Sequence, residues 1–159
     1  MNRIIIFEGT GSLGRKLIER FLPQQNTQVL VYSRDEAKHW TIKNELSDHP
    51  QKGCLSFMVG DIRDATRVAQ AIQFFDPTTV IVAAALKQVD TCELSPRESV
   101  ATNLQGTQNV LQAVSDYSTL RNRELKVLFV STDKACSPVN VYGMCKAISE
   151  RIITSAGYL

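Results

Sequence analysis

The chain has 159 residues, of which 43% are hydrophobic and 21% are charged, and these values suit one globular domain with a packed core. The net charge is only +2, and the basic residues are scattered rather than gathered with aromatic residues, which argues against a nucleic-acid partner. The longest apolar runs, such as residues 80–86, are far shorter than the roughly 20 residues of a membrane span. The apolar run at residues 4–7 is likewise too short for a signal peptide.

The predicted elements alternate along the chain between short apolar runs and segments with helical spacing. Residues 4–7 form the first expected strand, followed by a helix over residues 13–22 that ends at Pro23. Further strands are expected at residues 29–32, 55–59, 80–84 and 127–131, and further helices at residues 36–46, 68–75, 96–117 and 141–156.

The apolar runs are continuous rather than alternating, which is typical of strands buried on both faces of a parallel sheet. Strand–helix alternation with right-handed crossovers therefore predicts an α/β fold. We expect a Rossmann-like, doubly wound sheet with strand order 3-2-1-4-5, because the motifs described next favour it over a barrel.

A glycine-rich turn follows the first expected strand. Its residues, Gly9, Thr10, Gly11, Ser12, Leu13 and Gly14, fit G-x-G-x-x-G between a strand and a helix, which is the context that dinucleotide binding requires. Glycine lets the backbone approach a pyrophosphate closely, and the helix N-terminus offers free N–H donors. The turn predicts a dinucleotide site.

The end of the second strand carries Ser33, Arg34 and Asp35. An acid at this place usually binds the ribose 2′-hydroxyl of NAD, whereas an arginine suits the 2′-phosphate of NADP. Arg34 makes NADP the preferred cofactor and NAD the less favoured one, although Asp35 is only one position away.

A hydroxyl, a phenol and an amine occupy the last part of the chain. Thr132 follows the fifth expected strand, and Tyr142 and Lys146 share one face of the final helix at positions i and i+4. A cation beside a phenol stabilises the phenolate, which can then remove a proton from a substrate hydroxyl while a hydride leaves for nicotinamide. The pattern predicts an oxidoreductase step.

Three stretches give the chain a resemblance to a known family: residues 32–36, residues 83–89 with 102–107, and residues 131–143, which read S-T-D-K-A-C-S-P-V-N-V-Y-G. Along nearly its whole length the chain resembles the extended short-chain dehydrogenase/reductases. The greatest likeness is to their polysaccharide-biosynthesis branch, which includes inverting UDP-N-acetylglucosamine 4,6-dehydratases and related nucleotide-sugar epimerases.

The resemblance implies roles for individual residues. Thr132, Tyr142 and Lys146 correspond to the family's catalytic triad, and Asp133 and Lys134 to the pair that eliminates water across C5 and C6 of the sugar. The same resemblance implies a 4-keto intermediate and a nucleotide-sugar substrate. Further cofactor contacts are implied for Asp61 and Ile62 beside the adenine, for Ala83, Ala84 and Ala85 at the end of the fourth strand and Lys87 just beyond it, and for Asn103 near the active site.

The chain departs from the family pattern in two respects. In an alignment on Gly11 and Gly14, Phe7 and Glu8 stand where the family has Thr and its first Gly, which places a carboxylate near the phosphates and bears on cofactor affinity. The chain also ends after its last helix, whereas the family continues for about as long again into a domain that binds the sugar nucleotide. The expected domain is thus an NADP-binding one over residues 1–159.

Several interpretations remain open. The chain is expected to be part of a 4,6-dehydratase, with an epimerase of the same branch as the alternative. It could also be a non-catalytic NADP-binding module, paired with another chain or left over from a longer gene. The resemblance suggests a homo-oligomer. The cysteines Cys54, Cys92, Cys136 and Cys145 form no C-x-x-C pair, which indicates reduced, mostly buried thiols, no metal site and a cytoplasmic protein.

Overall fold

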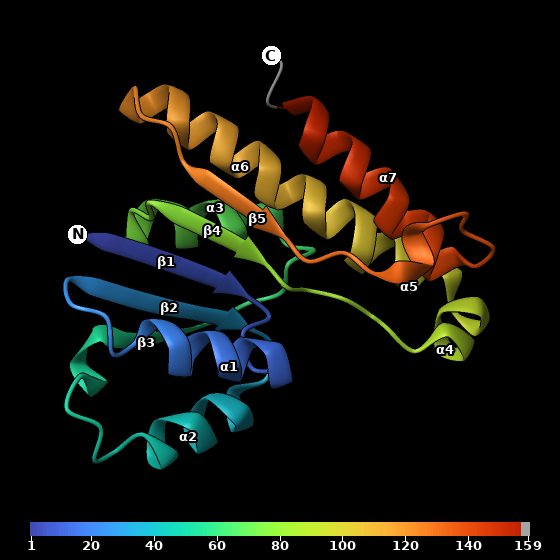
Figure 1. The fold of residues 1–159 in the computed structure, drawn as a ribbon. Coiled ribbons are helices and arrows are strands. Elements are labelled where there is room, and N and C mark those ends of the chain that lie inside the picture. Colours follow the sequence, from blue (N-terminus) through green and yellow to red (C-terminus); the bar gives the residue numbers. More distant parts are fainter. Residues whose placement is uncertain (157–159) are drawn as a thin grey trace.

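The fold is known from a computed structural model that describes residues 1–156. These residues form a five-stranded parallel sheet in the order β3-β2-β1-β4-β5, as the sequence predicted. The strands are β1 (Asn2–Phe7), β2 (Thr27–Ser33), β3 (Leu55–Val59), β4 (Thr79–Val82) and β5 (Lys126–Phe129). Their carboxyl ends meet at one edge of the sheet (Figure 1).

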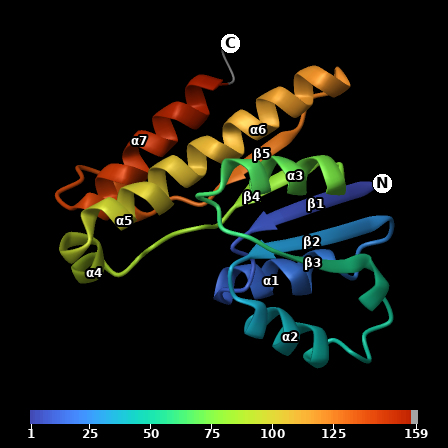
Figure 2. The same cartoon turned by 180° about the vertical axis from the view of Figure 1, so that it is seen from behind.

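Helices cover both faces of the sheet (Figures 1 and 2). On one face lie α1 (Ser12–Phe21) and α2 (Glu36–Glu45), and on the other lie α3 (Ala65–Phe75) and α6 (Gly106–Arg121). Each face has its own hydrophobic core: Ile6 and Ile18 are buried on the α1 side, and Ile5 and Val110 are buried on the α6 side. The sheet is thus doubly wound, as the continuous apolar runs predicted.

The long helix predicted over residues 96–117 is interrupted and extends further. It comprises α5 (Pro96–Val100), a π-helical turn (Ala101–Gln105) and α6, and it ends at Arg121. Val100 and Gly106 both have right-handed helical angles, so the three parts form one continuous helix. A short preceding helix, α4 (Val89–Leu94), was not predicted. The last helix, α7 (Val141–Ala156), has the predicted bounds.

Two strands end earlier than predicted. β4 ends at Val82 and β5 at Phe129, so the residues after them leave the sheet at its carboxyl edge. Val130 N–H still donates to Val82 O at 3.0 Å, which keeps the two chain segments together beyond the last regular pair. Consequently residues 83–87 and 130–131 are available to line a site at this edge.

Candidate functional site

The glycine turn joins β1 to α1 and uses its glycines in two ways. A Cβ on Gly14 would lie 2.1 Å from the carbonyl oxygen of Gly9, so α1 can pack on the turn only because position 14 has no side chain. Around Gly11, in contrast, an added Cβ would meet no atom within 4 Å. Gly14 is therefore needed for packing, and Gly11 keeps an open side on which a ligand can approach the backbone.

A cavity of about 300 Å³ opens at the carboxyl edge of the sheet. It brings together the glycine turn, the segment after β4, the segment after β5 and the first turns of α7, all of which the sequence predicted to act together. Its lining residues are Glu8, Thr10, Gly11, Ser12, Leu13, Gly14, Lys38, Ala83, Ala85, Lys87, Val130, Ser131, Tyr142 and Lys146.

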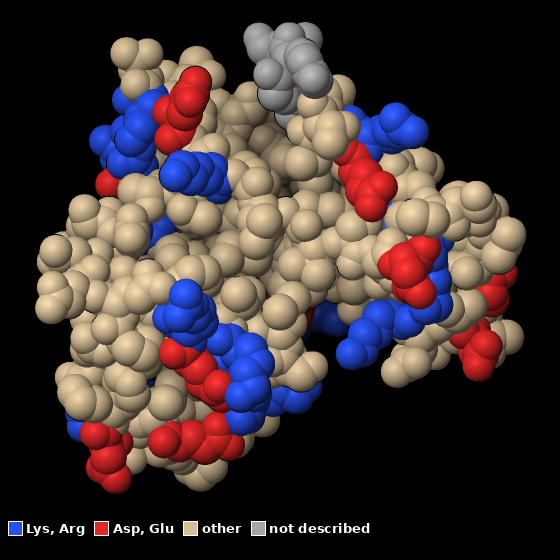
Figure 3. All heavy atoms as spheres, in the orientation of Figure 1, with Lys and Arg blue, Asp and Glu red and all other residues tan. Residues whose placement is uncertain are grey.

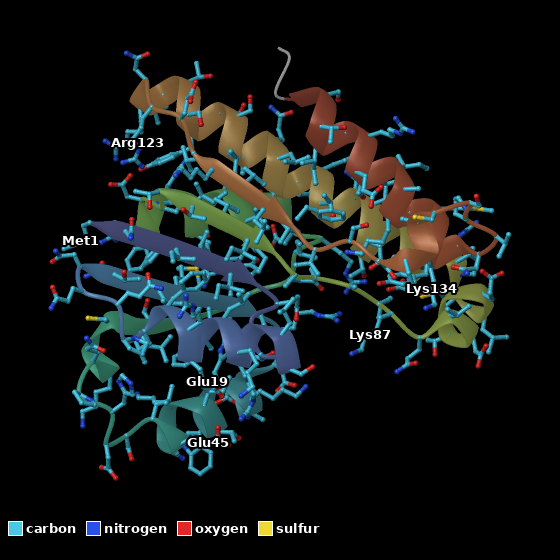
Figure 4. The ribbon with its side chains drawn as sticks, in the orientation of Figure 1. Met1, Glu19, Glu45, Lys87, Arg123 and Lys134 are labelled. Carbon is cyan, nitrogen blue, oxygen red and sulfur yellow. The ribbon has the colours of Figure 1, made fainter. Side chains whose placement is uncertain are left out.

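The surface and side-chain views show how this edge is built. A notch lies between α1 and the segment that carries α4, with basic side chains at its margin (Figure 3). Lys87 projects from the segment that leads from β4 to α4, and Lys134 lies near the start of α7 (Figure 4). Both lysines are exposed.

Lys146 is almost completely buried, with 1% of its surface exposed. Its ammonium donates to the carbonyl oxygens of Val130 at 2.9 Å and Ala84 at 3.3 Å, and it lies 4.3 Å from the centre of the Phe129 ring. Burial lowers the pKa of Lys146 from 10.5 to about 8. The amine is thus fixed in one place on the cavity wall, one helical turn from the Tyr142 side chain.

Thr132, Asp133 and Lys134 lie beside this cavity rather than on its wall. They form a short 3-10 turn in which the Thr132 hydroxyl donates to Asp133 Oδ1 at 3.0 Å, and the Lys134 ammonium lies 3.4 Å from the same oxygen. The Thr132 hydrogen bond and the Lys134 charge lower the pKa of Asp133. Ser131, which was not predicted as a site residue, lines the cavity instead and donates to Glu150 on α7.

The 3-10 turn is held against α7. A Cβ on Gly143 would lie 2.1 Å from the carbonyl oxygen of Lys134, so only glycine permits this contact between the turn and the helix. Asp133 and Lys134 are both exposed. They remain accessible to a ligand that extends out of the cavity.

A second cavity of about 350 Å³ adjoins the first, and Glu8, Thr10 and Lys38 line both. Arg34 and Asp35 complete its wall. The Asp35 carboxylate already has partners within its own segment. It accepts a hydrogen bond from Lys38 N–H at the start of α2 and forms an ion pair with the Lys38 ammonium at 2.7 Å. Arg34 is therefore the residue of the predicted pair that can present its charge to a ligand in this cavity.

Arg34 lies between two carboxylates. Its Nε is 3.8 Å from Glu8 Oε1, and one terminal nitrogen is 3.8 Å from Asp61 Oδ2. Asp61 also binds Arg63 at 2.6 Å, and although burial opposes the shift, the Arg63 hydrogen bonds hold the pKa of Asp61 below its usual value. Neither carboxylate was expected from the sequence to contact Arg34.

Besides Ala84, which is buried in the core on the α6 side, three predicted cofactor residues face other parts of the fold. Ser33 is fully buried and hydrogen-bonded to His39 Nε2 at 2.8 Å, and Ile62 is buried in the core on the α6 side. Asn103 is also buried, and its amide bonds both the N–H and the carbonyl of Leu86. Asn103 thus holds the segment that carries Ala85 and Lys87, and contact with a cofactor stays a prediction for all three residues.

The described residues also bear on metal ligands, membrane-spanning helices and the state of the cysteines. Within residues 1–156, no group of three or more His, Cys, Asp or Glu side chains could hold a metal ion. No helix in that range is long and apolar enough to cross a membrane. All four cysteines are free thiols; Cys92 and Cys145 are buried, Cys54 is half-buried and Cys136 is exposed.

Comparisons with known proteins agree with the resemblance. A family model described as polysaccharide biosynthesis protein matches residues 4–158. The inverting UDP-N-acetylglucosamine 4,6-dehydratase of Campylobacter jejuni (strain 81-176) is 38% identical over 157 residues, covering 96% of this chain and 43% of the relative. The UDP-glucose 4-epimerase of Rickettsia canadensis is 39% identical over 153 residues, which cover 94% of this chain and 42% of the relative.

A solved structure also matches. The Bordetella bronchiseptica enzyme WbmG in complex with NAD has a TM-score of 0.77 and 28% identity, covering 96% of this chain and 49% of WbmG. The chain therefore spans less than half the length of the relatives that it matches. Because the family model covers nearly all of the sequence, the chain belongs to the polysaccharide-biosynthesis branch of the extended short-chain dehydrogenase/reductases.

Proposed function

We propose that this chain is the dinucleotide-binding part of a nucleotide-sugar 4,6-dehydratase that works through a 4-keto intermediate with NADP. The observation that carries the proposal is the shared cavity, whose wall contains both the glycine turn and the Tyr142–Lys146 pair. Relatives named as a UDP-N-acetylglucosamine 4,6-dehydratase and a UDP-glucose 4-epimerase support the nucleotide-sugar substrate class.

The residues present fit a dinucleotide. Gly11 leaves open space beside the turn, two adjoining cavities provide an extended site, and Arg34 offers a cation at the far one. The glycine turn would hold the pyrophosphate, and Arg34 would bind a 2′-phosphate. A nicotinamide held there would supply the hydride-transfer chemistry that side chains lack.

Tyr142 and Lys146 would handle the proton of the C4 hydroxyl. The buried Lys146 ammonium is held by two backbone carbonyls, one helical turn from Tyr142. The Tyr142 oxygen would take the hydroxyl proton as C4 becomes a ketone. A C4 ketone makes the C5 proton acidic, which prepares the next step.

Asp133 and Lys134 favour the dehydratase over the epimerase. They form an accessible acid–base pair beside the cavity, where a sugar that extends from the nicotinamide end would meet them. One group of the pair would take the C5 proton and the other would protonate the departing C6 hydroxyl, so that water leaves. An epimerase would use the same ketone and has no need of this pair.

Cofactor binding can be tested on the chain itself. Titration calorimetry should show NADP binding more tightly than NAD, and Arg34→Ala should weaken NADP much more than NAD because only NADP carries the 2′-phosphate. Arg63→Ala serves as the matched control, because Arg63 also contacts Asp61 but lines neither cavity. Equal losses for the two dinucleotides would contradict the role of Arg34.

Turnover can be tested on the chain joined to the C-terminal part of the Campylobacter jejuni relative. Incubation with UDP-N-acetylglucosamine should give a 4-keto-6-deoxy sugar nucleotide. Tyr142→Phe should abolish oxidation and leave dinucleotide binding intact, whereas Tyr117→Phe, which alters a side chain bonded to Asp76 on another part of the molecule, should not change turnover. A C4 epimer as the only product would exclude the dehydratase.

The second candidate function is a dinucleotide-binding module without catalysis. The carboxylate of Glu8 inside the site favours it, because the family pattern has glycine at that position. Dinucleotide binding by the chain together with no turnover in the extended protein would select this function.

A further inference from the structure

Glu8 occupies a backbone position that suits glycine. Its φ is 61°, in the left-handed region, and its N–H donates to the carbonyl oxygen of Tyr32 at 2.7 Å. The other described non-glycine residues with positive φ are Asn26, Asp76, Asn122 and Ser137, all with short polar side chains that tolerate or cap such turns. Glu8 is thus a long carboxylate held in a conformation that its own side chain does not favour.

The Glu8 carboxylate lies where the two cavities meet. It lines both of them, and its side chain is 23% exposed. Arg34, the cation assigned to the 2′-phosphate, has Glu8 on one side and Asp61 on the other, each at 3.8 Å. A phosphate that binds Arg34 must therefore compete with a carboxylate that is already in place.

The basic groups around this point are all paired with acidic groups. The acidic groups are Glu8, Asp35, Asp61 and Glu98, and the basic groups are Arg34, Lys38 and Arg63. Each base is paired with at least one of the acids. A 2′-phosphate carries nearly two negative charges at neutral pH, so it enters a site with no net positive charge. Removing the Glu8 charge would leave Arg34 with one neighbouring carboxylate, that of Asp61, which Arg63 also binds.

We propose that Glu8 is a specificity-determining residue, whose carboxylate neutralises Arg34 and thereby lowers the preference of the site for a dinucleotide with a 2′-phosphate. The inference rests on the proposed function, since it concerns the same dinucleotide site. It assigns to Glu8 the selectivity between NADP and NAD rather than dinucleotide binding as a whole.

The titration of Glu8 supports the same conclusion. Burial raises the pKa of its carboxyl, and the Arg34 charge opposes the shift. Asp61 raises the pKa further and Lys38 lowers it. As the pH falls, protonation of Glu8 releases Arg34, so the ratio of NADP to NAD affinity should rise more in the wild type than in a variant with no carboxyl at position 8.

The test compares NADP and NAD binding by calorimetry in the wild type and Glu8→Gln. The variant should bind NADP about fivefold more tightly relative to NAD, the change that corresponds to a half-exposed ion pair of about 1 kcal/mol. Glu8→Gly, in which the left-handed backbone conformation no longer carries the penalty of a side chain, should give the same change in ratio. Glu45→Gln is the control for net charge, because Glu45, at the end of α2 (Figure 4), pairs with Arg15 on α1 and lines neither cavity.

A double-mutant cycle shows whether the effect acts through Arg34. In the Arg34→Ala background, Glu8→Gln should change the NADP to NAD ratio little, because the cation that Glu8 neutralises is absent. An equal change for both dinucleotides in Glu8→Gln would overturn the role of Glu8 and leave the proposed cofactor site standing. Failure of the wild type, Glu8→Gln and Glu8→Gly to bind either dinucleotide would overturn both.

Discussion

At the scale of single residues, the position of Lys146 combines two opposing effects. Burial of an ammonium is unfavourable, and it lowers the pKa of this side chain to about 8. The carbonyl oxygens of Ala84 and Val130 and the ring of Phe129 partly replace the lost water. The amine is therefore held at the cavity wall at some expense of stability, as is common for residues with a functional role.

This balance predicts a specific dependence of stability on pH. Because the pKa of Lys146 is lower in the folded chain than its ordinary value of 10.5, the unfolded chain binds more protons between about pH 8 and pH 10.5. The free energy of unfolding should thus gain a contribution from Lys146 as the pH rises through that range. Urea unfolding at a series of pH values should show this contribution in the wild type and not in Lys146→Met, while Lys134→Met, at an exposed position, should follow the wild type.

Gly14 gives a second prediction for a single residue. Gly14→Ala would place a Cβ 2.1 Å from the Gly9 carbonyl oxygen, so the backbone must move, at a cost of about 1–3 kcal/mol in the free energy of unfolding. Gly53→Ala is the matched control, since a Cβ there meets nothing within 4 Å. Equal stability of the two variants in urea would contradict the packing role of Gly14.

Gly11 should behave in the opposite way. A Cβ on Gly11 meets no protein atom, so Gly11→Ala should change the free energy of unfolding by less than about 0.5 kcal/mol. The added methyl group would occupy the space through which a pyrophosphate approaches the turn, and dinucleotide affinity should fall. Calorimetry on the folded variant separates the two effects, and unchanged affinity would show that the phosphates bind elsewhere.

At the scale of elements, the π-helical turn within the α5–α6 helix holds the segment after β4, which lines the site. Asn103 lies in this turn, and its amide binds Leu86 N–H at 2.8 Å, Leu86 O at 3.0 Å and the Ser99 hydroxyl at 3.1 Å. Its own carbonyl accepts from Thr107 and Ser149. The helix thus gives up regular geometry for one turn and gains a fixed connection to the segment after β4.

Asn103→Ala should release that segment. The Leu86 N–H would lose its side-chain partner, at a cost of about 1–3 kcal/mol when water cannot replace it. The Leu86 carbonyl would keep only the weak donor of the Cys92 thiol. Hydrogen exchange should show loss of protection at the Leu86 amide. Asn109→Ala, on the same helix but bonded to the carbonyls of Ile62 and Arg63, should leave that amide protected.

The elements also show what local sequence can predict. The strand runs were predictable because continuous apolar segments specify buried parallel strands. The order of the sheet was predictable because the dinucleotide-binding motif favours a doubly wound sheet. The π-helical turn was not predictable from the sequence. It accompanies a hydrogen bond between Asn103 and Leu86, and such a bond leaves no trace in the spacing of apolar residues. Tyr142 and Lys146 were found from their spacing, whereas Lys38 and Ser131 line the cavity only because α2 and the segment after β5 bring them there.

At the scale of the whole molecule, the two adjoining cavities form one extended site along the carboxyl edge of the sheet. A ligand that binds the folded chain and not the unfolded chain must raise the free energy of unfolding by mass action. NADP at a hundred times its dissociation constant should add about 2.7 kcal/mol and raise the melting temperature by several degrees. Thermal scans at increasing NADP concentration should show this, and a melting temperature independent of NADP would contradict the site.

Two walls of the Tyr142–Lys146 cavity come from opposite ends of the described chain: the turn after β1 and α7. Neither end can form the binding surface until the intervening strands have been ordered between them. During synthesis, the nascent protein should accordingly gain the ability to retain a dinucleotide only once α7 has docked. Retained dinucleotide would then report that residues 1–156 have reached their tertiary structure.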